Sequence, residues 1–287
     1  MEQYHPIVNF IYFAVVIGLS MSFLHPICLI ISITGAVAYA LFVFGADKVK
    51  RGFVTVFILM LLTALINPTF SHQGVTELYM LPSGNMLTLE SIWFGIGAAF
   101  MLGASLVWFR TMGEILTADK IIYLFGKTFP ILGLLLSMIL GFIPKLKYKY
   151  EQIKLCGNGV KLSGLAGIKH KIKQLSLLVT WMLEDSVEMG KSMRGRGYGI
   201  EGRINYSIYR FAARDGVMLI IIIALASYVI IGKVSGVLYW SYYPITEGAK
   251  LSAYGLSVYV AYFVLCMCAV FEEIRKDIVW KKSMSAI

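Results

Sequence analysis

An uncharged run of 42 residues, from 5 to 46, constrains this chain more than any other feature. A membrane-spanning helix needs about 20 consecutive apolar residues, so the run is long enough for two spans. Pro26 stands near its middle, and proline disrupts the interior of a helix. We therefore expect two membrane helices, over residues 7–24 and 26–45, joined by a tight turn.

The composition agrees with a membrane protein. Hydrophobic residues make up 58% of the 287 residues and charged residues 15%, whereas a soluble domain has about 45–50% apolar and about 25% charged residues. A chain this apolar cannot bury its hydrophobic surface in one water-soluble core, which excludes a cytosolic globular enzyme, a disordered protein and a disulfide scaffold. The predicted fold class is an all-α integral membrane protein.

Four more apolar runs are long enough to cross a membrane, which raises the predicted number of spans to about six. These runs cover residues 52–69, 90–109, 216–232 and 251–271. The run 128–144 has 17 residues and would reach only about 25 Å as a helix. Unlike the run 216–232, which has the same length, it lies between two basic stretches, 110–127 and 145–154. We expect this run not to cross the membrane, because basic stretches stay in the cytoplasm.

The distribution of Lys and Arg predicts the orientation of the spans. The net charge is +10, and residues 145–215 hold 14 basic and 6 acidic residues, whereas the loop 70–89 holds no Lys or Arg. Because basic segments stay in the cytoplasm, we expect both termini and residues 145–215 to be cytoplasmic in a multi-pass protein of the cell membrane. The chain then divides into an N-terminal membrane domain, 1–144, the cytoplasmic coupling segment, 145–215, and C-terminal spans with a cytoplasmic tail, 216–287.

Small residues recur four positions apart in two of the predicted spans, and such stripes let helices approach closely in lipid. Two interpretations are open at this stage. The stripes pack within this chain, or they form a docking face for another membrane protein. The residues are Ser32, Ala36 and Ala40 in the second span and Gly95, Ala99 and Gly103 in the fourth.

The segment 145–215 is the most informative part of the chain. A short basic helix is expected from Lys145 to Lys154, and a longer amphipathic helix from about Lys171. The longer helix carries one apolar stripe at helical spacing, and glycines suited to C-terminal caps follow it. The stripe comprises Leu175, Leu178, Val179, Met182, Leu183, Ser186, Gly190 and Met193, and the glycines are Gly195, Gly197 and Gly199.

Two arginines, Arg194 and Arg196, stand among the glycines at the end of the longer helix. Cations at this position complement the helix dipole, an interpretation that requires no partner protein. The functional interpretation is that the guanidiniums insert into an acidic groove of a cytoplasmic protein, because arginine binds carboxylates in a bidentate manner and keeps its charge. Nucleic-acid binding is disfavoured, since the cluster is short and has little aromatic interleaving.

Sequence motifs of an enzyme are absent. There is no phosphate-binding loop, no paired-His metal site and no cysteine spacing for a metal, so we expect a non-catalytic chain without metal or cofactor. The spans carry no charge at their centres, which disfavours a solo ion-coupled permease. A membrane-embedded enzyme of lipid or prenyl chemistry is a further alternative, with Glu184, Asp185 and Glu188 as its only acidic cluster. The pattern favours an ATP-driven complex whose motor is another protein.

The stretch from Leu175 to Asp215, "LSLLVTWMLEDSVEMGKSMRGRGYGIEGRINYSIYRFAARD", resembles the coupling region of the transmembrane T component of energy-coupling factor (ECF) transporters, the CbiQ-like family. There the corresponding helix ends in an Ala-Arg-Gly type motif followed by Tyr or Phe. The resemblance extends to "HPIVNFIYF" from His5, "NPTFSHQG" from Asn67, "GNMLTLESIWFG" from Gly84 and "FIPKL" from Phe142.

The resemblance implies a function. A T component is a scaffold in the bilayer that binds two ABC-type ATPase subunits and a substrate-binding membrane subunit, the S component, and it serves the uptake of a vitamin or a transition metal ion. The family has two arginine-bearing coupling motifs. The second corresponds to Arg194, Gly195, Arg196, Gly197 and Tyr198. The first falls near Lys154, Cys156 and Gly157, where the usual arginine is missing.

Overall fold

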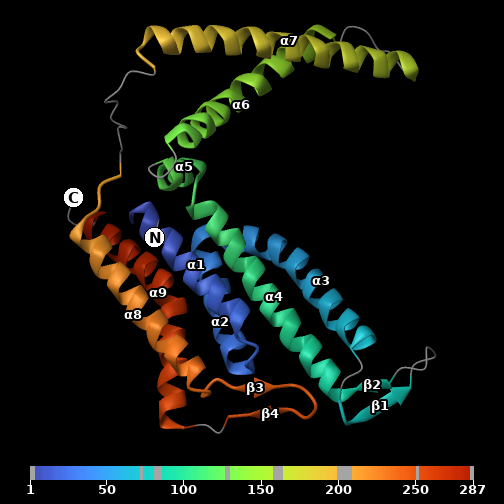
Figure 1. Ribbon diagram of the computed structural model, residues 1–287, viewed down its shortest axis with the longest axis vertical. Helices are drawn as coiled ribbons and strands as arrows, with labels where there is room; N and C mark the ends of the chain where they lie inside the picture. Colours follow the sequence, from blue (N-terminus) through green and yellow to red (C-terminus); the bar gives the residue numbers. More distant parts are fainter. Residues whose placement is uncertain are drawn as a thin grey trace. The chain divides into compact units, whose positions relative to one another are not determined.

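The computed structural model describes residues 4–71, 74–80, 86–126, 130–157, 164–198, 209–249 and 252–284 (Figure 1). The chain forms two units, each with its own internal contacts. Unit 1 combines Met1–Thr117 with Tyr209–Ile287, and unit 2 comprises Ala118–Ile208. Unit 2 is therefore an insertion between two halves of unit 1.

Unit 1 is a helical bundle with two short β-hairpins. Strand β1 pairs with β2, and β3 pairs with β4, both antiparallel. The helices are α1 (Pro6–Ser22), α2 (Pro26–Phe44), α3 (Ala46–Phe70), α4 (Leu89–Ile115), α8 (Ala213–Val234) and α9 (Ala253–Met284), and the strands are β1 (Glu77–Met80), β2 (Met86–Thr88), β3 (Trp240–Ser241) and β4 (Glu247–Gly248).

Each of the six predicted spans corresponds to one helix of unit 1. Helices α2, α3, α4, α8 and α9 are long and apolar enough to cross a membrane. Helix α1 is also apolar but has 17 residues, so it reaches only about 25 Å. The prediction of an all-α, multi-pass integral membrane protein with about six spans is confirmed.

Three spans extend well beyond the predicted limits. Helix α3 begins at Ala46, six residues before the predicted start, and α4 continues to Ile115, six residues past the predicted end. Helix α9 continues to Met284 instead of ending near residue 271. Each extension contains Lys or Arg, and both residues are strong helix formers. The apolar run therefore marks the part of each helix that suits the bilayer, while the helix itself continues beyond it.

The interior of unit 1 is built around fully buried aromatic rings. Tyr12, Phe13, Tyr39 and Trp108 pack edge-on or tilted against one another, with ring centroids 5.4–6.3 Å apart. The Trp108 indole N–H donates to Ser32 Oγ at 3.3 Å. Three helices, α1, α2 and α4, are thus held together by one aromatic cluster.

The small-residue stripes pack within the chain. Ser32, Ala36 and Ala40 are buried, and a Cβ added to Gly35 of the same helix would lie 2.8 Å from the Cβ of Cys266 in α9. On α4, Gly95 and Gly103 lie against α3 in the same close manner. Of the two interpretations left open by the sequence, the structure supports packing within this chain.

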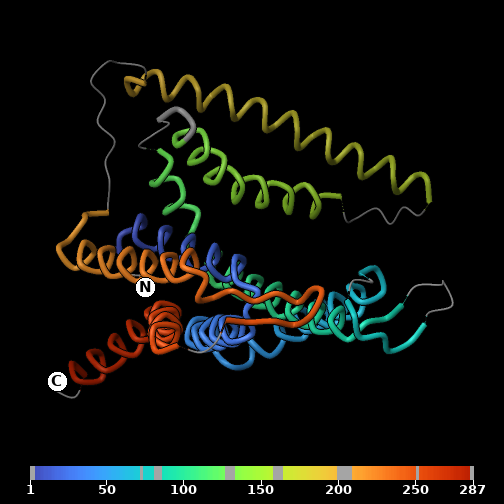
Figure 2. Tube along the Cα trace, turned by 60° about the horizontal axis from the view of Figure 1, so that its bottom comes forward, coloured from blue at the N-terminus to red at the C-terminus, as the bar shows by residue number. Residues whose placement is uncertain are grey.

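The two ends of unit 1 differ in charge. Both hairpins lie at one end of the bundle, and the other end holds the first described residues, the α2–α3 connection, the end of α4, the start of α8 and the end of α9 (Figures 1 and 2). We call the second end the basic end, because the described Lys and Arg residues of this unit lie there, with Lys233 as the exception. At the basic end Arg110 donates to the Lys48 carbonyl at 3.2 Å.

The described part of unit 2 contains three helices, α5 (Ala118–Gly126), α6 (Pro130–Gly157) and α7 (Leu165–Gly195). Helix α6 joins the apolar run 128–144 and the basic segment 145–154, which were expected to be separate. Pro144 lies inside α6 on an exposed side, where water can satisfy the carbonyl that its missing N–H leaves free. The predicted domain limits (1–144, 145–215 and 216–287) and the prediction that the run 128–144 does not cross depend on the position of the membrane. Both stay predictions.

Candidate functional site

Helices α6 and α7 form an antiparallel pair within unit 2. The rings of Phe142 and Trp181 are stacked at 6.1 Å, and the Lys149 ammonium lies 5.3 Å from the centre of the same indole ring. Nearer the start of α7, a Cβ added to Gly157 would clash with the Gln174 side chain. The pair is thus held at two separated points, one in the middle of α7 at Trp181 and one near its start at Gln174.

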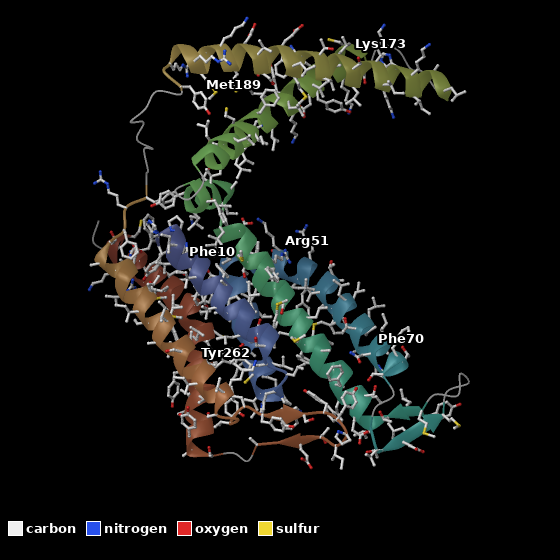
Figure 3. The ribbon with its side chains drawn as sticks, viewed as in Figure 1. Phe10, Arg51, Phe70, Lys173, Met189 and Tyr262 are labelled. Atoms are coloured by element: carbon white, nitrogen blue, oxygen red, sulfur yellow. The ribbon has the colours of Figure 1, made fainter. Side chains whose placement is uncertain are left out.

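Only one side of α7 packs against α6. The less exposed residues His170, Gln174, Leu178 and Trp181 follow helical spacing along that side. The predicted apolar stripe lies on the next side of the helix, where Leu175 is 58% and Leu183 is 64% exposed. The predicted period of the stripe holds, but Leu178 belongs to the packed side. Lys173 and Met189, labelled in Figure 3, mark the two halves of this helix.

The end of α7 is a complete Schellman cap. The Tyr198 N–H donates to the Met193 carbonyl at 3.0 Å, and the Gly197 N–H donates to the Arg194 carbonyl at 3.0 Å. Gly197 has φ +82°, the left-handed conformation that this cap requires and that glycine adopts without a Cβ clash. Gly197 therefore has the predicted cap role, whereas Gly195 is the last helical residue and Gly199 lies outside the described residues.

The cap holds two guanidiniums in solvent. Arg194 and Arg196 are both exposed, and Tyr198 is 43% exposed beside them. Among the described residues, neither guanidinium makes a hydrogen bond or an ion pair. Arg196 itself is the C-cap residue, with φ −87° and ψ 10°. The backbone at both arginines is thus fixed by the cap while their charges are available to a partner.

The weaker predicted site lies at the opposite end of the helix pair. Lys154 and Cys156 are exposed in the last turn of α6, and Gly157 lies against Gln174 of α7. From Gln174 to Arg194 is a helical distance of about 30 Å, at 1.5 Å per residue. The structure therefore does not bring the two predicted sites together. It separates them along one continuous helix.

The acidic residues considered for an enzyme show no metal-binding arrangement. Glu184 and Glu188 are exposed, whereas Asp185 is half-buried on the side of α7 that faces α6. Within the described residues, no group of three or more His, Cys, Asp or Glu side chains is placed to hold a metal ion.

Comparison with known proteins gives no match. No protein-family model matches the chain, and no curated protein matches it at a significant score. The roles of Arg194, Arg196 and the other coupling residues therefore stay predictions, which rest on the resemblance and on the geometry of α7.

Proposed function

We propose that this chain is the transmembrane scaffold and coupling subunit of an ATP-driven importer of the ECF type. In this proposal two partner ATPases hydrolyse ATP, and the chain transmits their motion to a substrate-binding membrane subunit that carries a vitamin or a transition metal ion. The chain itself is non-catalytic, lies in the cell membrane, and has both termini and residues 145–215 in the cytoplasm.

One observation carries the proposal: α7 ends in a rigid cap that presents Arg194 and Arg196 to solvent. A guanidinium on a fixed backbone loses little conformational freedom when it binds, and it can bind a carboxylate through two parallel hydrogen bonds. A loop with the same charges would lose more entropy on binding. The geometry suits a contact that must transmit force between two proteins.

A second feature supports two ATPase contacts rather than one. The site at Arg196 and the weaker site at Lys154 are separated by about 30 Å along α7. One small acidic groove cannot reach both. Two related subunits, each bound at one end of the helix pair, can both engage it.

Affinity purification tests the proposal. The tagged full-length chain, solubilised in mild detergent from its native membrane, is expected to retain two ABC-type ATPases and a small membrane subunit. Recovery of the chain without any ATPase, under conditions in which other ABC importers stay assembled, would contradict the proposal. Recovery of lipid-modifying activity with the purified chain alone would favour the enzyme alternative.

A further inference from the structure

A pocket of about 580 Å³ lies at the basic end of unit 1, where α8 begins and α9 ends. Tyr4 and Arg214 form one side, and the last three turns of α9 form the other. The coupling proposal uses none of these residues. The pocket lies outside the mostly apolar part of α9, which ends near Phe271, so it is placed at the level of the lipid headgroups.

Three cations line the pocket: Arg214, Arg275 and Lys276. Tyr4 positions two of them, because the Arg214 guanidinium lies 4.6 Å from the centre of the Tyr4 ring and Arg275 Nη2 lies 3.4 Å from the Tyr4 hydroxyl. Burial, and next a hydrogen bond with the Glu272 carboxylate, raise the pKa of Tyr4 to about 12. Tyr4 thus contacts both guanidiniums at this wall, one through its ring and the other through its hydroxyl.

The acids of the pocket limit the charge of its ligand. Glu272 lies 2.9 Å from Arg275, and Glu273, which is outside the lining, lies 3.8 Å from Lys276, both as ion pairs. Asp277 is on the same wall. The lining residues thus carry three cations and two carboxylates, a small positive excess rather than a strongly positive surface. That excess suits a phosphodiester with a single negative charge better than a free phosphate, which carries more charge at neutral pH and would be repelled by the two carboxylates.

The apolar part of the pocket indicates what is attached to the phosphate. Val279 and Trp280 line the pocket and are 62% and 67% exposed. Tryptophan is enriched at membrane–water interfaces, where its ring contacts both headgroups and acyl chains. A water-soluble anion would leave these two side chains uncovered, whereas the glycerol and upper acyl chain of a lipid would cover them.

We propose that this pocket binds the phosphodiester headgroup of an anionic glycerophospholipid. Arg214, Arg275 and Lys276 contact the phosphate, and Val279 and Trp280 contact the glycerol and acyl region. Basic pockets between transmembrane helices are a known means of binding anionic headgroups. A lipid bound here would tie the start of α8, from which the chain enters the bundle again after unit 2, to the end of α9.

Native mass spectrometry of the full-length chain in detergent tests the site, with short-chain phosphatidylglycerol and phosphatidylcholine as probes. Phosphatidylglycerol is expected to bind at least about fivefold more tightly, because each basic residue near a lipid surface contributes about that factor. Arg214→Gln and Lys276→Gln should each lose about fivefold in affinity for phosphatidylglycerol. The matched control is Lys50→Gln, an exposed lysine at the same end but outside the pocket, which should lose nothing.

Three results would overturn the proposal. The two lipids could bind equally well to the wild-type chain, a comparison that needs no variant. Lys50→Gln could weaken binding as much as the pocket variants, which would indicate a diffuse surface charge. Inorganic phosphate could displace phosphatidylglycerol at equal concentration, which would assign the pocket to a free anion.

The contact with the acyl region has its own test. Trp280→Ala should weaken the binding of both lipids by a similar factor, and an unchanged affinity for both would contradict the acyl contact.

Discussion

Replacing Gly197 by Ala should weaken the end of α7 without changing any charge. Gly197 has φ +82°, and an L-residue with a side chain pays roughly 1–2 kcal/mol in the left-handed region. That free energy corresponds to a factor of about 5–30 in the equilibrium between the formed and the opened cap. The change is confined to two hydrogen bonds, from Gly197 to Arg194 and from Tyr198 to Met193, so the melting temperature of the bundle should not move.

Gly195 offers a matched control on the same cap. Gly195 is helical, and a Cβ built on it meets no atom within 4 Å. Alanine is favoured over glycine by about 1 kcal/mol in a helix, so Gly195→Ala should strengthen the end of α7. The two variants add the same methyl group two residues apart and are expected to act in opposite directions.

Hydrogen exchange and partner binding provide the assays for this pair. In Gly197→Ala, the amides of residues 197 and 198 should exchange about 5–30 times faster, and the affinity for the ATPases should fall by up to the same factor, since binding must first restore the cap. Gly195→Ala should slow exchange and keep the affinity. The reasoning is refuted if Gly197→Ala leaves exchange unchanged, or if both variants lose affinity equally.

Three further predictions concern the membrane unit and its ends. Gly35→Ala should destabilise the bundle by about 1–3 kcal/mol through overpacking against α9, seen as a lower melting temperature in detergent; Gly18→Ala, which meets no atom within 4 Å, should have little effect. In a chain without native cysteines, a cysteine at Gly74 should react with an impermeant reagent from outside the cell and one at Lys169 should not; external labelling at residue 169 would contradict the orientation. Burial raises the pKa of the Tyr4 phenol to about 12. Its contribution to the free energy of unfolding should therefore be fully present below pH 10 and be lost as pH rises towards 12. The absorbance difference at 295 nm between wild type and Tyr4→Phe should have its midpoint near pH 12, and a midpoint near 10 would show a solvated phenol.

The sequence predicted the positions of the membrane spans more accurately than the residues at which the helices end. Pro26 and the uncharged run gave α1 and α2 within about two residues, because proline and apolarity act locally. The extension of α9 to Met284 and the passage of α6 through Pro144 were missed. Hydrophobicity does not report on helix formation by charged residues. A proline inside a helix leaves one backbone carbonyl without its hydrogen bond, and water can bind that carbonyl where the turn is exposed.

The candidate site shows the same division between local and tertiary features. The cap at Gly197 could be predicted, since a glycine among helix-ending residues is the usual residue for a left-handed position. The pairing of Phe142 with Trp181 could not, because a contact between residues 39 positions apart depends on how two helices cross. Helical period likewise placed Leu178 in the same stripe as Leu175, although only Leu178 is buried. Periodicity identifies an apolar side but not which of two adjacent sides is packed.

Charge reversal at Arg196 tests the coupling proposal most directly. Losing one partner of a buried charge pair costs about 2–5 kcal/mol, so Arg196→Glu should reduce ATPase recovery more than about thirtyfold, whereas Arg196→Lys should cost less because only the bidentate geometry is lost. Lys50→Glu, an equal reversal at an exposed position outside both coupling sites, should keep most of the ATPases. With membrane expression held equal, the account predicts loss of ATPases and of substrate uptake in Arg196→Glu alone, and normal ATPase recovery with normal uptake in that variant would contradict it.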